Sequence, residues 1–228
     1  MQSQPAQIQD WPLPEVRGKY LGDVALADLC WFRVGGTADV VFMPADVDDL
    51  SAFLAALPDE VPLHILGAGS NTLVRDGGVR GVVLRLGAAF GQVTQTSQTH
   101  MLAGAATLDV KLARAAADVS LSGLEFYRGI PGAIGGAIAM NAGAYGGETS
   151  DVLVEVEALD RAGNKHVFSA DDLQLSYRHN GYSEFLVYTG ARFEATPGDQ
   201  PTILAAMEEI SAKREQTQPI KSRTGGST

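Results

Sequence analysis

The stretch GLEFYRGIPGAIGGAIAMNAGAYGG, from Gly123 to Gly147, carries eight glycines within 25 residues. Glycine is a poor residue for the interior of a helix, where it costs about 1 kcal/mol relative to alanine. Such clustering indicates that another surface lies directly against bare backbone. Because the residues between the glycines are mostly small or apolar, the glycine-rich stretch suits a flat ligand with a phosphate tail. A tightly packed helix crossing with a glycine-rich turn is the structural alternative.

A second glycine cluster lies upstream, in the segment HILGAGSNT from His64 to Thr72. It reads as a strand that runs into a loop, residues 67–72, called here the Gly67 loop. Successive free N–H groups in such a loop form a concave anion site, to which Ser70 and Asn71 add side-chain donors. A dinucleotide fingerprint would need a third glycine, where Thr72 stands, and a Walker loop would need Gly-Lys-Ser/Thr. By itself the loop is equally consistent with an ordinary turn.

Composition limits the classes of protein that fit. A net charge of −10 on 228 residues disfavours a general binder of nucleic acid or of anionic membranes. The only cysteine is Cys30, so no internal disulfide can form, which fits a reducing cytoplasm. The four histidines are not at metal-ligand spacing, and we expect no metal site. The first residues do not resemble a signal peptide, and no apolar run reaches the roughly 18 residues of a membrane span.

Short strands and helices mix along the chain without regular βαβ order, which favours an α+β fold. The pattern predicts strands at 40–43, 63–66, 82–86, 152–159, 166–168 and 185–193, and a hairpin at 93–96 and 101–103. Helices are expected after the N-cap residues Asp46 and Thr107 and at 203–213, with short helices after Ser122 and Pro131. The apolar face of the helix after Thr107 is predicted to be Leu108, Leu112, Ala115 and Val119.

Four units are expected from these elements. Residues 1–30 are predicted to be an extended N-terminal arm that joins the body near Trp31. The body, 31–195, divides into subdomains of about 31–120 and 121–195. Residues 196–228 hold a helix and the start of a further region. The sequence carries no prediction of oligomeric state.

Four segments together resemble one family. They are WFRVGG at 31–36, LGAGSNTLVRDGGVRGVVLRLG from Leu66, the glycine-rich stretch, and REQTQPIKSRTGGST from Arg214. In this order and spacing the chain is similar to the MurB family of UDP-N-acetylenolpyruvoylglucosamine reductases, over nearly all of 31–228. The third segment is highly specific to the family, and the presence of the second and third segments together is the strongest part of the resemblance.

The resemblance implies an FAD-binding fold of the vanillyl-alcohol-oxidase (PCMH) type, in which two α+β subdomains hold FAD between them. The pyrophosphate is expected on the Gly67 loop, and the adenosine along 129–136. The residues nearer the isoalloxazine are expected to be Asn141 to Tyr145. The cofactor-binding residues implied are Gly67, Ala68, Gly69, Ser70, Asn71, Thr72, Gly129, Ile130, Pro131, Gly132, Ile134, Gly135, Gly136, Asn141, Gly143 and Tyr145.

The family reaction implied by the resemblance is a reduction in two steps. NADPH reduces FAD, and hydride then passes from N5 to C3 of UDP-N-acetylglucosamine enolpyruvate, giving UDP-N-acetylmuramate for peptidoglycan. Arg178, in a Tyr-Arg element, is expected to pair with the substrate carboxylate, and Ser227 to donate the proton to C2. Tyr145 and Arg214 are weaker candidates for contacts with the UDP-sugar or the cofactor. Asn180 stands where the family usually has serine.

Family members continue into a third domain that closes over the UDP-sugar, and no segment of this chain matches it. The expectation is a fragment with a complete FAD site and an incomplete active site. One alternative is an FAD-binding module without reductase turnover. Another is a different flavin oxidoreductase of this fold, which would typically tether its flavin through a histidine or cysteine. Cys30, His64 and His100 lie outside the glycine-rich segments expected to face the ring, which disfavours this alternative.

Overall fold

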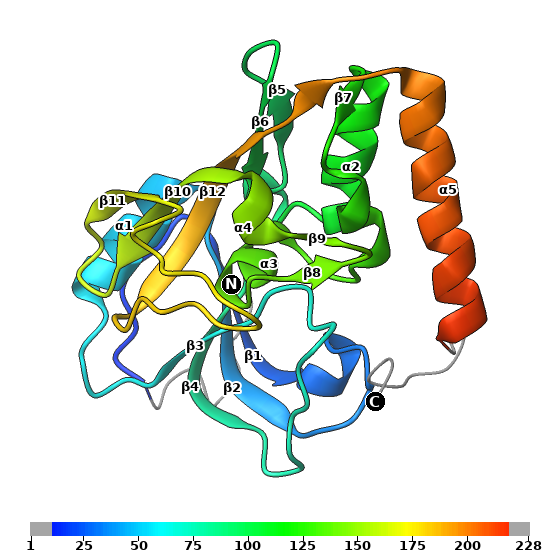
Figure 1. Cartoon of the computed structure of the whole chain (residues 1–228). Coiled ribbons are helices and arrows are strands. Elements are labelled where there is room, and N and C mark those ends of the chain that lie inside the picture. Colours follow the sequence, from blue (N-terminus) through cyan, green and yellow to red (C-terminus); the bar gives the residue numbers. More distant parts are fainter. Residues whose placement is uncertain (1–10, 219–228) are drawn as a thin grey trace.

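Two mixed layers of sheet and helix make up residues 11–218, the part of the chain that the computed structural model describes (Figure 1). The first sheet has the strand order β1-β2-β4-β3. Its strands are β1 (Lys19–Ala25), β2 (Thr37–Met43), β3 (Leu63–Ile65) and β4 (Val79–Leu84). β1 is antiparallel to β2, whereas β2, β4 and β3 are parallel. The predicted strands at 40–43 and 63–66 are thereby confirmed.

The N-terminal region differs from the extended arm that the sequence predicts. β1 pairs with β2 from Lys19 to Ala25 and forms an edge of the first sheet. Its residues alternate between exposed and half-buried positions, a weak pattern because only one face of an edge strand meets the core. Because few of its residues are buried, this strand has a weak apolar pattern in the sequence, and the region therefore resembles an extended arm.

Helix α1 (Val47–Ala56) covers the first sheet and begins as the sequence predicts. The Asp46 carboxylate accepts a hydrogen bond from the Asp49 N–H at 2.9 Å, as an N-cap residue does. Phe53 on α1 packs on Phe42 of β2 with ring centroids 4.2 Å apart. Both side chains are fully buried, so this contact joins helix to sheet in the core of the first layer.

The second sheet has the order β11-β10-β12-β6-β5, with every neighbouring pair antiparallel. Its strands are β5 (Val93–Gln95), β6 (His100–Gly104), β10 (Leu153–Asp160), β11 (Lys165–Ser169) and β12 (Leu186–Glu194). The predicted hairpin and the three later strands are confirmed. The two sheets separate between β4 and β5, earlier than the subdomain division near residue 120 that the sequence suggests. The domain bounds themselves stay a prediction.

Helix α2 (Asp109–Asp118) lies on the second layer, with two differences from the expectation. Its N-cap residue is Leu108, which makes no side-chain cap, while the Thr107 hydroxyl donates to the Gln92 carbonyl at 3.1 Å. Its buried face is Leu112, Ala113, Ala116 and Ala117, whereas Leu108 and Val119 are exposed. The helix begins one residue later than predicted, so Leu108 precedes it, and the side that packs on the core is the one bearing Leu112, Ala113, Ala116 and Ala117.

The remaining elements are the 3₁₀ turns η2 (Leu26–Asp28), η3 (Ala88–Phe90) and η4 (Glu125–Gly129), the helices α3 (Ile134–Ala139), α4 (Thr149–Val152) and α5 (Gln200–Thr217), and the strand pairs β7 (Leu121–Ser122) with β13 (Thr196–Pro197) and β8 (Gly143–Ala144) with β9 (Gly147–Glu148). Of these elements, η2 packs on the first sheet and most of the others lie on the second layer. The short helices expected after Ser122 and Pro131 are therefore present, as is the helix at 203–213.

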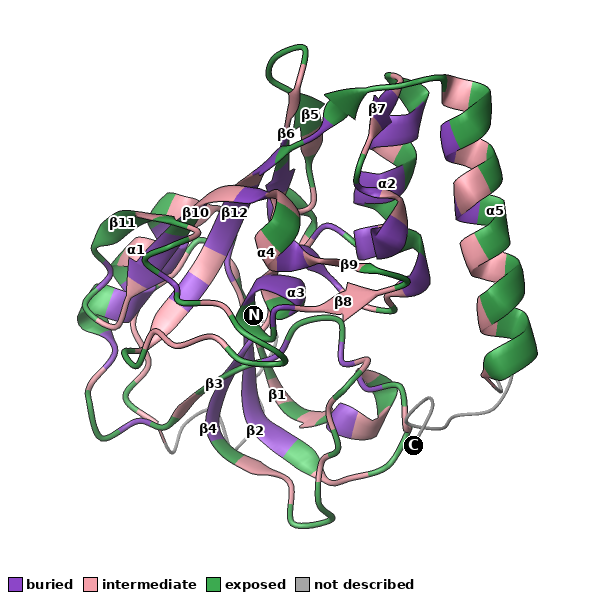
Figure 2. Ribbon diagram, in the orientation of Figure 1, coloured by how far each residue is buried: buried purple, intermediate pink, exposed green. Residues whose placement is uncertain are grey.

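Helix α5 stands beside α2 and contacts η4 (Figure 1). Ile203 and Met207 are its buried residues, and most of the rest of its surface is exposed, as Figure 2 shows. The Asp199 carboxylate caps its first turn by accepting from the Thr202 N–H at 3.1 Å. Among residues 11–218, no helix combines the length and apolar character that crossing a bilayer requires.

Candidate functional site

The Gly67 loop and the glycine-rich stretch, far apart in sequence, meet in space. The Asn71 amide of the loop donates to the Met140 sulfur at 3.4 Å. A second contact lies at Gly132: from the point where a Cβ on Gly132 would stand, the Ser70 hydroxyl oxygen is 3.7 Å away. The structure therefore brings together the two segments that the sequence singles out, at the junction of the two layers.

The two glycines of the Gly67 loop differ in whether their surroundings require glycine. Gly69 has a φ of +69°, and a Cβ there would stand 2.3 Å from the Leu29 carbonyl oxygen, so only glycine fits. Gly67 is exposed, and a Cβ there would have no atom within 4 Å. No atom of the described residues requires glycine at position 67, and the ligand contact expected there stays a prediction.

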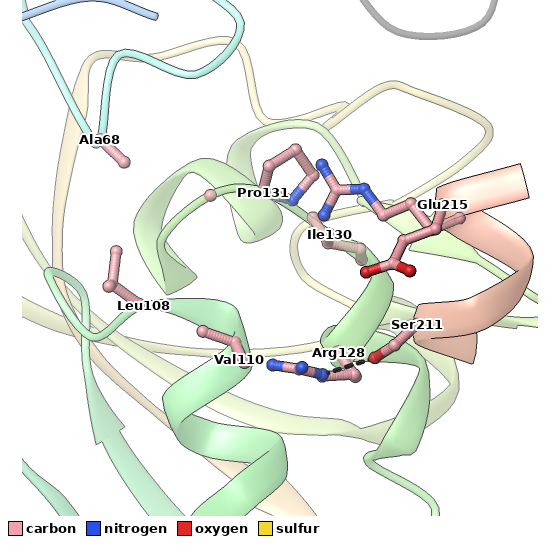
Figure 3. Close-up of a pocket in the computed structure, with 10 residues that line it drawn as sticks. Ala68, Leu108, Val110, Arg128, Ile130, Pro131, Ser211 and Glu215 are labelled. Atoms are coloured by element: carbon pink, nitrogen blue, oxygen red, sulfur yellow. Dashed lines mark hydrogen bonds between the residues drawn. The ribbon is translucent and has the colours of Figure 1, made fainter. Parts of the chain in front are cut away.

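A pocket of about 410 Å³ opens between the Gly67 loop, the start of α2, η4 and the end of α5 (Figure 3). Four of the residues that line the pocket are among those predicted from the sequence to bind the cofactor: Ala68, Ile130, Pro131 and Gly132. Sequence reasoning also identified Arg214, and it missed Leu108, Val110, Arg128, Ser211 and Glu215. The Arg128 Nε donates to the Ser211 hydroxyl at 2.8 Å and so ties η4 to α5 beside the pocket.

The missed pocket residues lack a sequence signal of their own. Leu108 is half exposed because it precedes α2 rather than lying on its buried face. Ser211 and Glu215 occupy the polar side of α5 and read as solvent-facing residues. Their role depends on where α5 stands, which is a tertiary feature.

Members of the glycine-rich stretch predicted to contact a cofactor divide into two groups. Ile134 is fully buried in the core, and a Cβ on Gly135 would lie 3.3 Å from Ala105, so these two positions serve helix packing. Gly136 is exposed with open space above it, as at Gly67. The packing interpretation therefore holds for Gly135, and a ligand contact at Gly136 stays a prediction.

Asn141 is buried and its side chain is fully engaged within the protein. Its amide nitrogen donates to the Ser176 carbonyl at 3.2 Å, and its oxygen accepts from the Ser150 N–H at 2.9 Å. The sequence predicts a cofactor contact here, whereas the structure gives this side chain another use. It ties the glycine-rich stretch to the turn that carries Arg178.

Arg178 lies in an exposed turn closed by the bridge between Ser176 and His179. Its Nη2 donates to the Gly143 carbonyl at 3.1 Å, and its guanidinium lies 5.5 Å from the centroid of the Tyr177 ring. A cation on an aromatic ring is a favourable arrangement. These contacts place the predicted catalytic arginine beside the end of the glycine-rich stretch.

Tyr145 and Arg214 lie close to η4 and to the residue that follows it. The Tyr145 ring packs on Gly129, where a Cβ would come within 2.3 Å of it, and its φ is +55°. Arg214, near the end of α5, donates to the Gln218 amide oxygen at 3.4 Å and lines the pocket. Ser227 lies outside the described residues.

The structure also identifies a residue that the sequence reading passed over. Asp109, the first residue of α2, is fully buried, and neither carboxyl oxygen has a hydrogen-bond partner in the described chain. Burial raises the pKa of Asp109 to about 8. From the sequence, an acid in a first helical turn reads as a favourable partner of the helix dipole, so only burial reveals the anomaly.

Comparisons with known proteins agree with this geometry. Residues 38–169 match a family model described as "FAD binding domain". The chain is 56% identical over 216 residues to the UDP-N-acetylenolpyruvoylglucosamine reductase of Parvibaculum lavamentivorans, covering 95% of this chain and 69% of that protein. The crystal structure of the Thermus caldophilus reductase superposes with a TM-score of 0.77 at 34% identity, over 90% of this chain and 71% of that one.

A more distant neighbour, 6-hydroxy-D-nicotine oxidase from Arthrobacter nicotinovorans, superposes with a TM-score of 0.61 at 16% identity. It covers 80% of this chain and 43% of that chain. At this identity the likeness concerns the fold alone. The expected α+β fold of the vanillyl-alcohol-oxidase type is thereby confirmed.

The residues present fit FAD. Gly67 and Gly136 leave bare backbone open to solvent on the two facing segments. The volume of the adjoining pocket lies within the range of sites for small molecules and cofactors, about 300–1,000 Å³. A long dinucleotide can therefore lie along the junction with one end in the pocket.

Proposed function

Because the chain belongs to the family of UDP-N-acetylenolpyruvoylglucosamine reductases, we propose that it is an FAD-dependent enzyme acting on UDP-N-acetylglucosamine enolpyruvate. The observation that carries the proposal is the junction of the Gly67 loop with the glycine-rich stretch, beside which Arg178 is held on Gly143. The product, UDP-N-acetylmuramate, belongs to peptidoglycan synthesis. We place the reaction in the cytoplasm and name NADPH as the reductant.

The residues that would hold FAD follow from the junction. The backbone N–H groups of the Gly67 loop would receive the pyrophosphate, since successive free N–H groups form an anion site. The pocket beside Ile130 and Pro131 would receive the adenosine half. Arg214 lines this pocket, and we assign it to the dinucleotide rather than to the sugar substrate.

Bound FAD, once reduced by NADPH, supplies the hydride that reaches C3 of the enolpyruvyl group. Negative charge then develops at C2 and on the substrate carboxylate, and a fixed cation beside them lowers the free energy of the transition state. Arg178 suits this role because its planar guanidinium can donate two parallel N–H bonds to a carboxylate. The Gly143 and Tyr177 contacts support a fixed orientation for it. Ser227 as the proton donor to C2 stays a prediction, as does a substrate contact by Tyr145.

Two measurements on the purified chain test the proposal. The first is a flavin absorbance spectrum with mass spectrometry of the released cofactor, where FAD is the expected result. The second is oxidation of NADPH that depends on UDP-N-acetylglucosamine enolpyruvate, with UDP-N-acetylmuramate as the product. A protein that neither carries nor binds FAD contradicts the proposal. FAD binding without substrate-dependent oxidation identifies an FAD-binding module instead.

A further inference from the structure

We propose that Asp109 is a positioning residue for FAD, whose uncharged carboxylic acid donates to Ser70 and thereby turns the Ser70 hydroxyl toward a phosphate oxygen. The inference rests on the proposed FAD site and adds a residue to it. Neither residue has a role in the family resemblance beyond the membership of Ser70 in the Gly67 loop.

The first observation is the isolation of the carboxyl group. Asp109 is fully buried, and both of its oxygens lack a hydrogen-bond partner in the described structure. It begins a helix, where N–H groups are free to bond an anion, yet it uses none of them. An unpaired buried carboxylate is costly, and a protonated one still has a donor to satisfy. A polar group brought beside the carboxyl by a small movement of the loop would give it a partner.

The second observation is where the carboxyl lies. From the point where a Cβ on Gly132 would stand, the Asp109 Oδ2 is 2.7 Å away and the Ser70 Oγ is 3.7 Å away. The Asp109 N–H also donates to the Gly132 carbonyl at 3.1 Å, which fixes the start of α2 on the glycine-rich stretch. Both oxygens therefore border the space that a side chain at position 132 would fill. Ser70 has no hydrogen bond of its own among the described residues, so its hydroxyl is available.

The charged groups of the surrounding elements offer Asp109 no ion pair. Burial is the cause of its raised pKa, and no neighbouring charge contributes. The Gly67 loop contains no titratable side chain. On α2, Lys111 donates to the Gly91 carbonyl and Arg114 pairs with Asp118. On η4, Arg128 donates to Ser211, and Tyr127 is buried. On α5, Arg214 and Glu215 line the pocket.

The protonation state of Asp109 decides what Ser70 offers to a phosphate. The neutral acid donates its proton to the Ser70 oxygen, and the Ser70 hydrogen is then free to bond a phosphate oxygen. The ionised form would accept that hydrogen and leave only lone pairs toward the phosphate. It would also add a negative charge beside the pyrophosphate. FAD should therefore bind the form with neutral Asp109.

The test measures the dissociation constant of FAD by flavin fluorescence between pH 6 and pH 9, for the full chain and its variants. If only the neutral form binds, the wild-type constant is flat at low pH and rises toward tenfold per pH unit above the pKa of Asp109. Asp109→Asn keeps a donor and cannot ionise, so its constant stays flat, within about threefold of the wild-type value at pH 6. Asp118→Asn, on the exposed end of the same helix, serves as the matched control and keeps the wild-type profile.

Ser70→Ala tests the contact itself. It should weaken FAD binding roughly three- to tenfold at pH 6 and reduce the pH step, because the group that Asp109 orients is gone. In the Ser70→Ala background, Asp109→Asn should remove only the smaller pH step that remains from the charge of Asp109, and it should change FAD affinity at pH 6 less than it does in the wild type. Additive effects of the two substitutions would overturn the proposed contact.

A measurement on the wild-type protein covers the case in which Asp109→Asn does not fold. At pH 7 the infrared spectrum should contain the carbonyl band of a protonated carboxylic acid, which shifts when FAD binds. No such band, or a band indifferent to FAD, overturns the inference. So does a pH profile shared by the wild type and Asp109→Asn. A wild-type chain that does not bind FAD at any pH contradicts the proposed function instead.

Discussion

Three non-glycine residues of the predicted site have left-handed backbone conformations: Asn141 at φ +39°, Tyr145 at +55° and Arg178 at +53°. Such conformations are uncommon outside glycine and cost of order 1–3 kcal/mol each. They persist where surrounding contacts hold them, and here Asn141 bonds to Ser176 and Arg178 bonds to Gly143. At the scale of the residue, the turn bearing Arg178 and the end of the glycine-rich stretch support each other.

Replacement of Arg178 should separate catalysis from cofactor binding. Arg178→Lys retains the charge but loses the planar pair of donors, so we expect kcat to fall by about 100- to 1000-fold. FAD affinity should stay at the wild-type level because Arg178 is expected to meet the substrate. Stopped-flow flavin reoxidation by the enolpyruvyl substrate measures this effect. Near-normal turnover in the variant would remove Arg178 from the catalytic role.

Asp109 makes folding stability depend on pH. Its pKa is raised to about 8 in the fold, while the unfolded chain has an ordinary aspartate value near 3.8. Between these values the unfolded chain binds fewer protons, so stability falls as pH rises, by about 1.4 kcal/mol per unit from this residue. This loss of stability is absent at pH values below the pKa of Asp109 in the unfolded chain, and it is complete at pH values above its pKa in the folded chain.

Urea unfolding of the apoprotein at pH 5 and pH 8 checks this dependence, with Asp109→Asn for comparison. The free energy of unfolding of the variant should increase relative to that of the wild type as pH rises. Any effect of the amide itself on stability is the same at both pH values and does not change this trend. A difference between the two proteins that does not change with pH would contradict the raised pKa.

At the scale of the element, the Gly67 loop combines a glycine required by the fold with one that the fold leaves open. Gly69 has a positive φ and packs on the Leu29 carbonyl, whereas Gly67 faces open space. The strand β3 delivers the loop to the edge of the first sheet, and among the described residues no backbone N–H of the loop donates to a backbone carbonyl. The loop is therefore rigid at one glycine and accessible at the other.

Alanine substitutions at these two glycines should have opposite consequences. Gly69→Ala should lower the free energy of unfolding by roughly 1–3 kcal/mol, because the new Cβ meets backbone and the conformation is strained. Gly67→Ala should leave stability within about 0.5 kcal/mol and weaken FAD binding, because its methyl group occupies the ligand's side of the loop. Chemical unfolding and FAD titration of both variants measure this contrast. Equal effects on stability would show that Gly67 is also structural.

At the scale of the whole molecule, the site is made by both layers and by α5. The Gly67 loop follows the first sheet, α2 and the glycine-rich stretch belong to the second layer, and α5 closes one side of the pocket. A ligand that spans these parts binds the folded chain and not the unfolded one. It should therefore stabilise the whole molecule.

Added FAD should raise the thermal midpoint of the apoprotein. At a free concentration 100 times the dissociation constant the gain is about 2.7 kcal/mol, or roughly 5–10 °C for a chain of this size. Differential scanning fluorimetry with a dye that does not overlap flavin emission measures the shift, and riboflavin serves as a control that lacks the pyrophosphate. A shift as large with riboflavin would contradict the role given to the Gly67 loop.

The sequence by itself determined the α+β class, most strands, the helix capped by Asp46, and the two glycine segments of the site. These features are local: a strand pattern, a cap and a glycine cluster are written in neighbouring residues. Local pattern was insufficient for β1, because an edge strand buries only one face and resembles an arm. It was also insufficient for α2, because small alanines carry little periodic signal and tertiary packing decided that Ala113, Ala116 and Ala117 face the core.

Only the tertiary structure decided which glycines of the stretch pack and which stay open, and which polar residues lose their solvent. Gly135 packs on Ala105 and Gly136 faces solvent, although the two are adjacent in sequence. Asp109 reads as an ordinary first-turn acid until the Gly67 loop, α2 and Gly132 are seen to enclose it. The physical reason is the same in each case: burial depends on segments distant in the chain, and burial sets both the space beside a Cα and the cost of a charge.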